Sequence, residues 1–234
     1  MTMNETMQRV RSDNFAWLKL IALILMFFDH ASMMYLRAMH IPDESSPLRL
    51  PGRFCIPVFG YLIAYGYLNF SRHRMRYMLR VAAIAVLAEP CYWLCLREHG
   101  NAFIPLAMAL LVFVLADKQV VAVKPLVYIG GLIAAVLATF YAHTYDVVLV
   151  YAMCCFFRLA IEFGAGWGVP AFACALVSDW PFDGAVWALL LTFAVIWAAM
   201  RYRFHLPRIH IHKAVAYAFY PGHLLFLSFF AYWG

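Results

Sequence analysis

The sequence predicts an all-α membrane protein, a helix bundle of about nine spans. Of its 234 residues, 66% are hydrophobic and 13% are charged, whereas about 25% of the residues in an ordinary soluble domain are charged. The mean hydropathy is +0.77. Short polar turns separate long apolar runs, and nothing in the sequence indicates a soluble domain or a linker. We therefore treat residues 1–234 as a single integral membrane domain.

Nine apolar runs give the predicted spans, at residues 16–39, 54–70, 75–96, 102–116, 123–142, 147–161, 167–177, 184–200 and 214–233. The first run reaches the roughly 20 residues of a spanning helix and follows a polar segment, so we expect a retained span and not a cleaved signal. Pro90 in the third run, and Pro221 with Gly222 in the ninth, loosen their helices. The seventh run is too short for a straight crossing. A broken or re-entrant segment is indicated there by Gly164, Gly166, Gly168 and Pro170.

Lysine and arginine predict the orientation, because cytoplasmic loops collect these residues. With nine spans and a cytoplasmic N-terminus, fourteen of the 18 basic residues fall on the cytoplasmic side, and the outer side keeps Arg37, Arg49, Arg53 and Arg97. We therefore expect the N-terminus in the cytoplasm and the C-terminus outside. The net charge of +6 is explained by these flanking residues, so we expect no nucleic-acid partner.

An acid and a histidine stand together inside the first span. An apolar run leads into Asp29 and His30 and continues as far as Leu36. A charge at the centre of a bilayer costs about 3 kcal/mol or more and is usually functional. If Lys19 lies at the cytoplasmic edge, the rise of an α-helix places His30 about 16 Å along the axis, near the midplane.

A second histidine reaches the same depth from the last span. Lys213 marks the cytoplasmic edge, and His223 lies about 15 Å farther along the helix. A histidine can act as a general base near neutral pH, with a carboxylate fixing its tautomer. The alternative is a neutral histidine that is hydrogen-bonded between helices. Adjacent helical residues point about 100° apart, so Asp29 and His30 need not touch.

Three further polar residues are candidate substrate-binding groups. Arg53 closes the outer loop, where its side chain either reaches Asp29 or extends to the membrane interface. Glu89 lies in the third span and either joins the site, pairs with an arginine or faces a wet cavity. Asn101 opens the fourth span, either as a helix N-cap or as a residue that lines the site.

The sequence predicts no metal centre. The six cysteines fall in apolar runs without a CxxC pair, which is typical of small packing residues. His205, His210 and His212 share a cytoplasmic loop, but a metal site there would need a closed geometry and a further ligand.

Four motifs follow one another along the chain. The first reads Lys19-x-x-Ala22-x-x-x-Met26-x-x-Asp29-His30. Residues 52–59 read Gly-Arg-Phe-Cys-Ile-Pro-Val-Phe, residues 101–107 read Asn-Ala-Phe-Ile-Pro-Leu-Ala, and residues 219–224 read Phe-Tyr-Pro-Gly-His-Leu. In this order, over nearly its whole length, the chain resembles the TraX proteins, conjugal-transfer pilin acetylases of the bacterial inner membrane that are distantly similar to multi-span membrane acyltransferases. It departs from them at Tyr145-Asp146, where members often carry Tyr-Gly.

The resemblance implies transfer of an acetyl group from acetyl-CoA to the N-terminal amine of a pilin-like membrane protein. His30, oriented by Asp29, would deprotonate that amine or carry the acetyl group transiently. His223 and Arg53 would polarise the thioester carbonyl or hold a coenzyme A phosphate, and Tyr220 of the last motif is a candidate substrate contact. A cytoplasmic cluster either binds nucleotide phosphates or anchors a helix end, and consists of Arg72, Arg74, Arg76 and Arg80.

Two other classes of function fit the same residues. A proton-coupled transporter would use Asp29, His30 and Glu89 as a relay, although the two halves of the chain show no repeat of the kind that many transporters have. In a non-catalytic assembly factor of a secretion machine, the polar residues would only join helices to one another.

Overall fold

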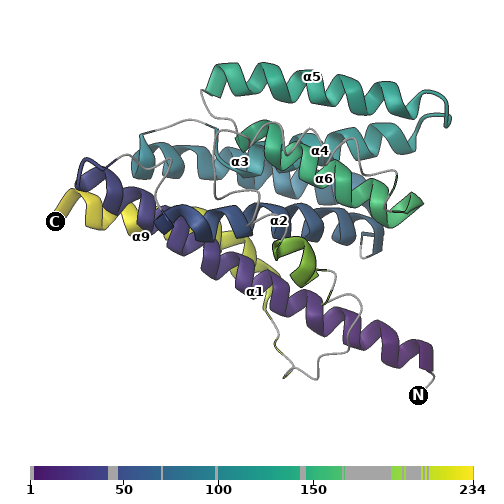
Figure 1. The fold of residues 1–234 in the computed structure, drawn as a ribbon, viewed down its shortest axis with the longest axis horizontal. Coiled ribbons are helices and arrows are strands. Elements are labelled where there is room, and N and C mark those ends of the chain that lie inside the picture. Colours follow the sequence, from purple (N-terminus) through teal and green to yellow (C-terminus); the bar gives the residue numbers. More distant parts are fainter. Residues whose placement is uncertain are drawn as a thin grey trace.

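Helices form all the regular structure that the computed structural model describes, which comprises residues 3–41, 47–69, 71–97, 100–142, 146–164, 166, 191–196, 198, 207, 209 and 211–233 (Figure 1). In chain order they are α1 (Met3–Ala38), the short 3-10 helix η1 (Pro47–Arg49), α2 (Leu50–Asn69), α3 (Arg74–Leu96), α4 (Phe103–Asp117), α5 (Lys124–Ala142), α6 (Asp146–Phe163) and α9 (Lys213–Trp233). Residues 191–196 are also helical. The all-α prediction is confirmed for these residues.

The number of membrane crossings is only partly supported. Two helices are long and apolar enough to cross a bilayer, Phe15–Ala38 within α1 and Arg74–Leu96. Shorter apolar helices occupy Phe54–Asn69, Phe103–Asp117, Lys124–Phe140 and Ala214–Phe230. The predicted seventh span, 167–177, and most of the eighth lie outside the described residues. Nine spans are therefore not confirmed.

Large apolar side chains project outward from the bundle. Val86 on α3 is 73% exposed, and Leu126 and Phe140 on α5 are 66% and 73% exposed. Contiguous apolar surface of this kind suits contact with lipid, since soluble proteins rarely leave it open to water. With the two long apolar helices, it indicates a membrane protein.

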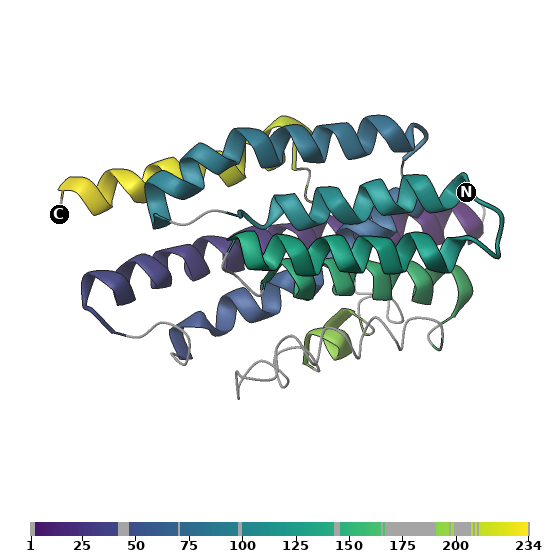
Figure 2. The ribbon, with the colours of Figure 1, turned by 90° about the horizontal axis from the view of Figure 1, so that it is seen from above.

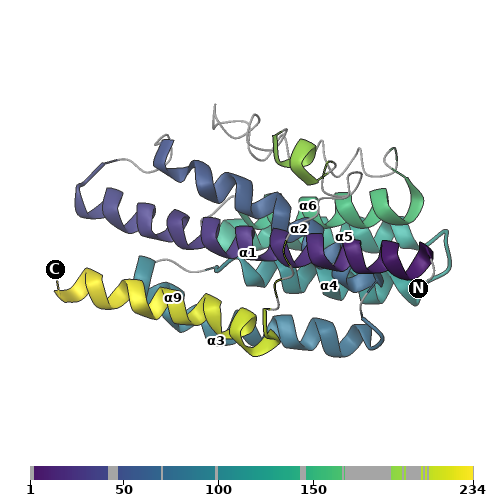
Figure 3. The same cartoon turned by 90° about the horizontal axis from the view of Figure 1, so that it is seen from below.

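The helices pack in an order that differs from their order in the chain. α2 contacts α1 and α6, α3 contacts α4 and α9, and α5 covers α4 and α6. The chain termini lie at opposite ends of the bundle (Figures 1 and 2). α1 and α9 are in contact and run in the same direction (Figure 3). The first and last helices of the chain therefore share an interface.

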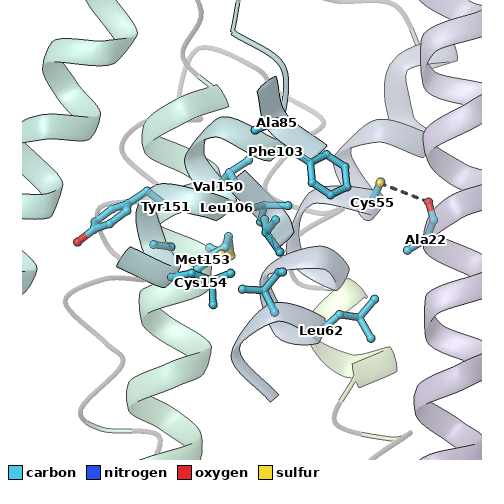
Figure 4. Close-up of a cluster of buried hydrophobic side chains, with 14 of the residues drawn as sticks. Ala22, Cys55, Leu62, Ala85, Phe103, Leu106, Val150, Tyr151, Met153 and Cys154 are labelled. Atoms are coloured by element: carbon cyan, nitrogen blue, oxygen red, sulfur yellow. Dashed lines mark hydrogen bonds between the residues drawn. The ribbon is translucent and has the colours of Figure 1, made fainter. Parts of the chain in front are cut away.

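The core lies where α2, α4 and α6 meet (Figure 4). Leu106 of α4 is buried there with Leu62 of α2 and Met153 of α6. Gly60 allows α2 to approach α6, because a Cβ atom at this position would lie 3.0 Å from Cβ of Met153. This close packing holds α2 against α6 at this point.

A buried ion cluster joins the end of α4 to three other helices. Asp117 pairs with Arg158 of α6 at 2.6 Å and with Arg74 of α3 at 2.5 Å. It also accepts a hydrogen bond of 2.6 Å from the hydroxyl of Tyr67 on α2. Arg158, which is 1% exposed, bonds Glu162 as well. Because a buried cation without its acid is costly, this cluster fixes the register of α2, α3, α4 and α6.

Candidate functional site

His30 and His223 meet in the interior, between α1 and α9. Nδ1 of His30 lies 2.7 Å from Nε2 of His223. The two rings are stacked, with centroids 5.0 Å apart and an angle of 11° between their planes. Both residues are buried. The equal depths predicted from helix rise therefore correspond to a direct contact between the two imidazoles.

The hydrogen bonds define which nitrogen of His30 is basic. The Phe219 carbonyl lies 2.8 Å from Nδ1 of His223 and can only accept, so this nitrogen carries the proton. In a neutral His223 ring, Nε2 is then the acceptor, and Nδ1 of a neutral His30 must donate to it. Nε2 of His30 consequently holds the lone pair. That atom can accept a proton or attack an electrophile.

Aromatic rings surround the imidazole pair. Tyr92 and Tyr220 each meet the His30 ring edge to face, with centroids 6.0 Å away. The hydroxyl of Tyr220, which is fully buried, accepts a hydrogen bond of 3.3 Å from the backbone N–H of Ala102. This bond ties the last helix to the start of α4. The rings restrict rotation of both imidazoles and exclude water around them.

Asp29 is held from the side opposite to α9. Nε of Arg49 lies 3.1 Å from Oδ1 of Asp29, and both side chains are largely buried. The carboxylate lies against the backbone of Gly52, where a methyl group would overlap it. Gly52 therefore provides the close approach that brings the start of α2 to this acid.

From the sequence, Arg53 was the candidate to reach Asp29, with extension to the membrane interface as the alternative. Arg49 was counted only as an outer basic residue. The structure describes Arg53 as part of α2, but its side chain lies outside the described residues. Arg49 and Gly52 are three residues apart and share one face of the turn that leads into α2. That spacing, next to the predicted Gly-Arg motif, is the signal that would have identified Arg49.

Glu89 and Asn101 bind each other and the α3–α4 loop. Oε1 of Glu89 accepts a hydrogen bond of 2.9 Å from the N–H of Gly100, and Oε2 accepts one of 2.6 Å from the Asn101 amide. Oδ1 of Asn101 accepts the N–H of Phe103 at 3.0 Å, as an N-terminal cap does. These contacts shape the loop that carries Ala102 to Tyr220, so both residues support the site through the backbone.

A small cavity adjoins the imidazole pair, and we call it the histidine cavity. Its volume is about 90 Å³, and its polar wall consists of Asp29, His30, Arg49 and Tyr92. The remaining wall is mostly apolar. A small group entering this cavity would meet His30 directly.

A larger cavity lies toward the basic end of the bundle, and we call it the basic cavity. Its volume is about 380 Å³, and its polar wall includes Lys19, Ser71, Arg72, His73 and Arg80. Three cations on one wall favour a polyanionic ligand such as a phosphate ester.

The other two arginines proposed to hold a cofactor are placed differently. Arg74 pairs with Asp117 in the ion cluster. Arg76 is exposed on α3 and does not itself line the basic cavity, although it lies one turn before Arg80, which does. Lys19, which served in the sequence analysis only to mark the membrane edge, joins Arg72 and Arg80 at this cavity.

A protein family and a curated protein are similar to this chain. The family described as TraX protein matches residues 14–231. A "Probable fimbrial assembly protein FimC, serogroup H1" from Dichelobacter nodosus is 28% identical over 115 residues, which cover 44% of this chain and 46% of that protein. The chain thus spans about half the length of this curated relative. No solved structure matches the chain.

Proposed function

The chain belongs to the TraX protein family, and from that premise we propose that it is a membrane N-acetyltransferase. It would move an acetyl group from acetyl-CoA to the N-terminal amine of a pilin-like membrane protein. The observation that carries this proposal is the hydrogen bond between His30 and His223, which leaves a basic Nε2 on His30, a residue that lines the histidine cavity. The similarity to a probable fimbrial assembly protein supports an acceptor of the pilin class.

In the direct route, His30 acts as a general base. The amine nitrogen forms a C–N bond to the thioester carbonyl carbon while Nε2 of His30 takes a proton from the amine. The C–S bond then breaks, and the thiolate of coenzyme A takes that proton from His30. A positioned base of this kind contributes roughly 10²- to 10⁴-fold to the rate.

A covalent route uses the same atoms. Nε2 of His30 forms a C–N bond to the acetyl carbon as the C–S bond breaks and the thiolate leaves. The amine then attacks the acetyl carbon, the bond to Nε2 breaks, and the amine proton passes to the thiolate of coenzyme A. In both routes His30 becomes cationic, and its Nδ1–H bond to His223 becomes charge-assisted. His223 is therefore a positioning residue that stabilises the charged form of His30.

The basic cavity is the proposed site for coenzyme A. Lys19, Arg72 and Arg80 would hold its phosphates. This assignment places the basic end of the bundle in the cytoplasm, where acetyl-CoA is found, and Asp29 toward the outer face of the bacterial inner membrane. The pilin amine would approach from that outer face.

Label transfer tests the proposal. The purified protein is incubated with labelled acetyl-CoA and a pilin peptide that has a free N-terminus, with an N-terminally blocked peptide as the acceptor control. We expect label on the free peptide alone and a roughly 10²- to 10⁴-fold loss in His30→Ala. The matched control is His40→Asn, because His40 is exposed at the end of α1 and has a φ of 55°, which Asn tolerates. Full activity of His30→Ala would refute the proposed base.

A non-catalytic assembly factor is the second candidate, favoured by the name of the relative from Dichelobacter nodosus. The two functions predict different results in cells that lack the protein. An assembly factor carrying His30→Ala would restore pilus assembly fully, and no acetylated pilin would be found in the wild-type strain. An acetyltransferase carrying the same change would leave the pilin N-terminus free, as intact-mass measurement of the pilin would show.

A further inference from the structure

The histidine cavity and the basic cavity share part of their walls. Phe59 of α2 and Phe103 and Leu106 of α4 line both of them. The two cavities therefore adjoin at these three side chains, between the proposed phosphate-binding region and His30.

The cavities follow one another along the helix axes. On α1, Phe15, Lys19 and Leu23 line the basic cavity. Met26, His30 and Met33 continue the same helical face at spacings of three and four, and they line the histidine cavity. Lys19 and His30 are separated by about 16 Å of helix rise. An extended ligand bound at Lys19 could thus point its far end toward His30.

One of the shared side chains, Phe103, is linked to the histidine pair through Tyr220. The rings of Phe59 and Phe103 have centroids 6.4 Å apart, and Leu106 follows one turn after Phe103 on α4 (Figure 4). Phe103 also packs against Tyr220, at 4.4 Å between centroids. Tyr220 in turn contacts both imidazoles, at 6.0 Å and 5.5 Å. A movement of Phe103 is therefore transmitted to the catalytic rings through one side chain.

We propose that Phe59, Phe103 and Leu106 form a gate between the two cavities that admits a short acyl group to His30 and rejects longer ones. The inference rests on the proposed acetyltransferase function. The histidine cavity, at about 90 Å³, has room for a group of a few heavy atoms, such as the three of an acetyl group. The bulk of coenzyme A stays on the basic side of the gate, while its thioester reaches into the opening. The new C–N bond then forms beside His30, the C–S bond breaks, and the thiolate takes the proton from His30 before it leaves on the basic side.

Two sets of variants test the gate in opposite directions. Phe59→Ala and Phe103→Leu widen it, with Phe156→Ala as the matched control, because Phe156 is partly buried on α6 and lines neither cavity. Leu106→Trp narrows it, with Leu111→Trp as the control on the exposed face of the same helix. Each purified variant is checked for its melting temperature. Transfer to the free-amine peptide is then measured with acetyl-, butyryl- and hexanoyl-CoA, and coenzyme A binding is measured by calorimetry.

The wild-type protein should prefer acetyl-CoA to butyryl-CoA by about 10²-fold and to hexanoyl-CoA by more, since each extra methylene in a fitted pocket reduces the rate by roughly tenfold. The widened variants should lose most of this preference. Leu106→Trp should transfer acetyl about tenfold more slowly than the Leu111→Trp control. An unchanged chain-length preference in both widened variants, with acetyl transfer intact, would overturn the gate alone. A wild-type protein that transfers no acyl group would overturn the proposed function and the gate with it.

Discussion

Replacement of His223 by Leu or by Gln tests whether His30 is the reacting histidine and His223 its hydrogen-bond acceptor. In the structure, His223 Nε2 accepts from His30 Nδ1, and the two atoms are 2.7 Å apart. Leu fills a similar volume but accepts no hydrogen bond, whereas the amide oxygen of Gln can take the place of Nε2. The pair of variants therefore separates the loss of the acceptor from the loss of the ring.

The magnitude follows from the charge on His30 during transfer. A hydrogen bond to a charged group contributes about 1.5–3 kcal/mol, and each 1.36 kcal/mol of barrier is tenfold in rate. His223→Leu should therefore lower kcat roughly 10- to 150-fold. His30→Ala should lower it roughly 10²- to 10⁴-fold, and His223→Gln should stay within about tenfold of the wild type.

Steady-state acetyl transfer to the free-amine peptide, at varied acetyl-CoA concentration, measures these effects. KM for acetyl-CoA should stay unchanged in both His223 variants, because His223 lies outside the residues lining the basic cavity. Two results would refute the reasoning. If His223→Leu kept the wild-type kcat, the hydrogen bond would have no role in transfer. If it lost as much activity as His30→Ala, while His30→Ala itself retained the covalent label, His223 would be the reacting group.

Three further substitutions have defined outcomes. Gly52→Ala should lower kcat about tenfold by displacing the Asp29 carboxylate in the wall of the histidine cavity, with coenzyme A affinity unchanged by calorimetry; an unaltered kcat would show that transfer does not depend on the place of that carboxylate. Arg158→Met should cost about 1.5–3 kcal/mol of stability in a denaturation series in mixed micelles, because it removes a charge-assisted bond from Asp117, which keeps Arg74 and Tyr67 as partners; a loss below about 1 kcal/mol would show that the cluster is not structural. Arg80→Gln should raise KM for acetyl-CoA about tenfold, whereas Arg76→Gln, one turn earlier on the same helix and not lining the cavity, should leave it unchanged; equal effects would point to general charge attraction.

The shared level of His30 and His223 along the bundle was predictable from the sequence, because helix rise is a one-dimensional count. Lys19 and Lys213 served as references, and the count placed His30 and His223 at the same level. Their contact at 2.7 Å depends also on α1 and α9 being neighbours with these faces turned together. No pattern in the sequence predicts that α1 and α9 are neighbours, because all the other described helices lie between them in the chain.

Side-chain pairing was less predictable. Arg49 lies in the η1 turn, so its reach to Asp29 depends on loop geometry that hydropathy does not encode. Arg158 was counted by charge on the cytoplasmic side, a rule that says nothing about its distance from Asp117. Glu89 and Asn101 were separate candidates, and only the path of the α3–α4 loop brings them to 2.6 Å.

The contact between His30 and His223 joins positions 193 residues apart. A chain that contains α1 to α6 without α9 has only one of the two imidazoles. It would lack the hydrogen-bond acceptor of His30, so the proposed transfer activity would depend on the presence of α9. The same separation makes the protein a candidate for split expression, in which a fragment carrying α1 and a fragment carrying α9 regain activity only by assembling in the same membrane.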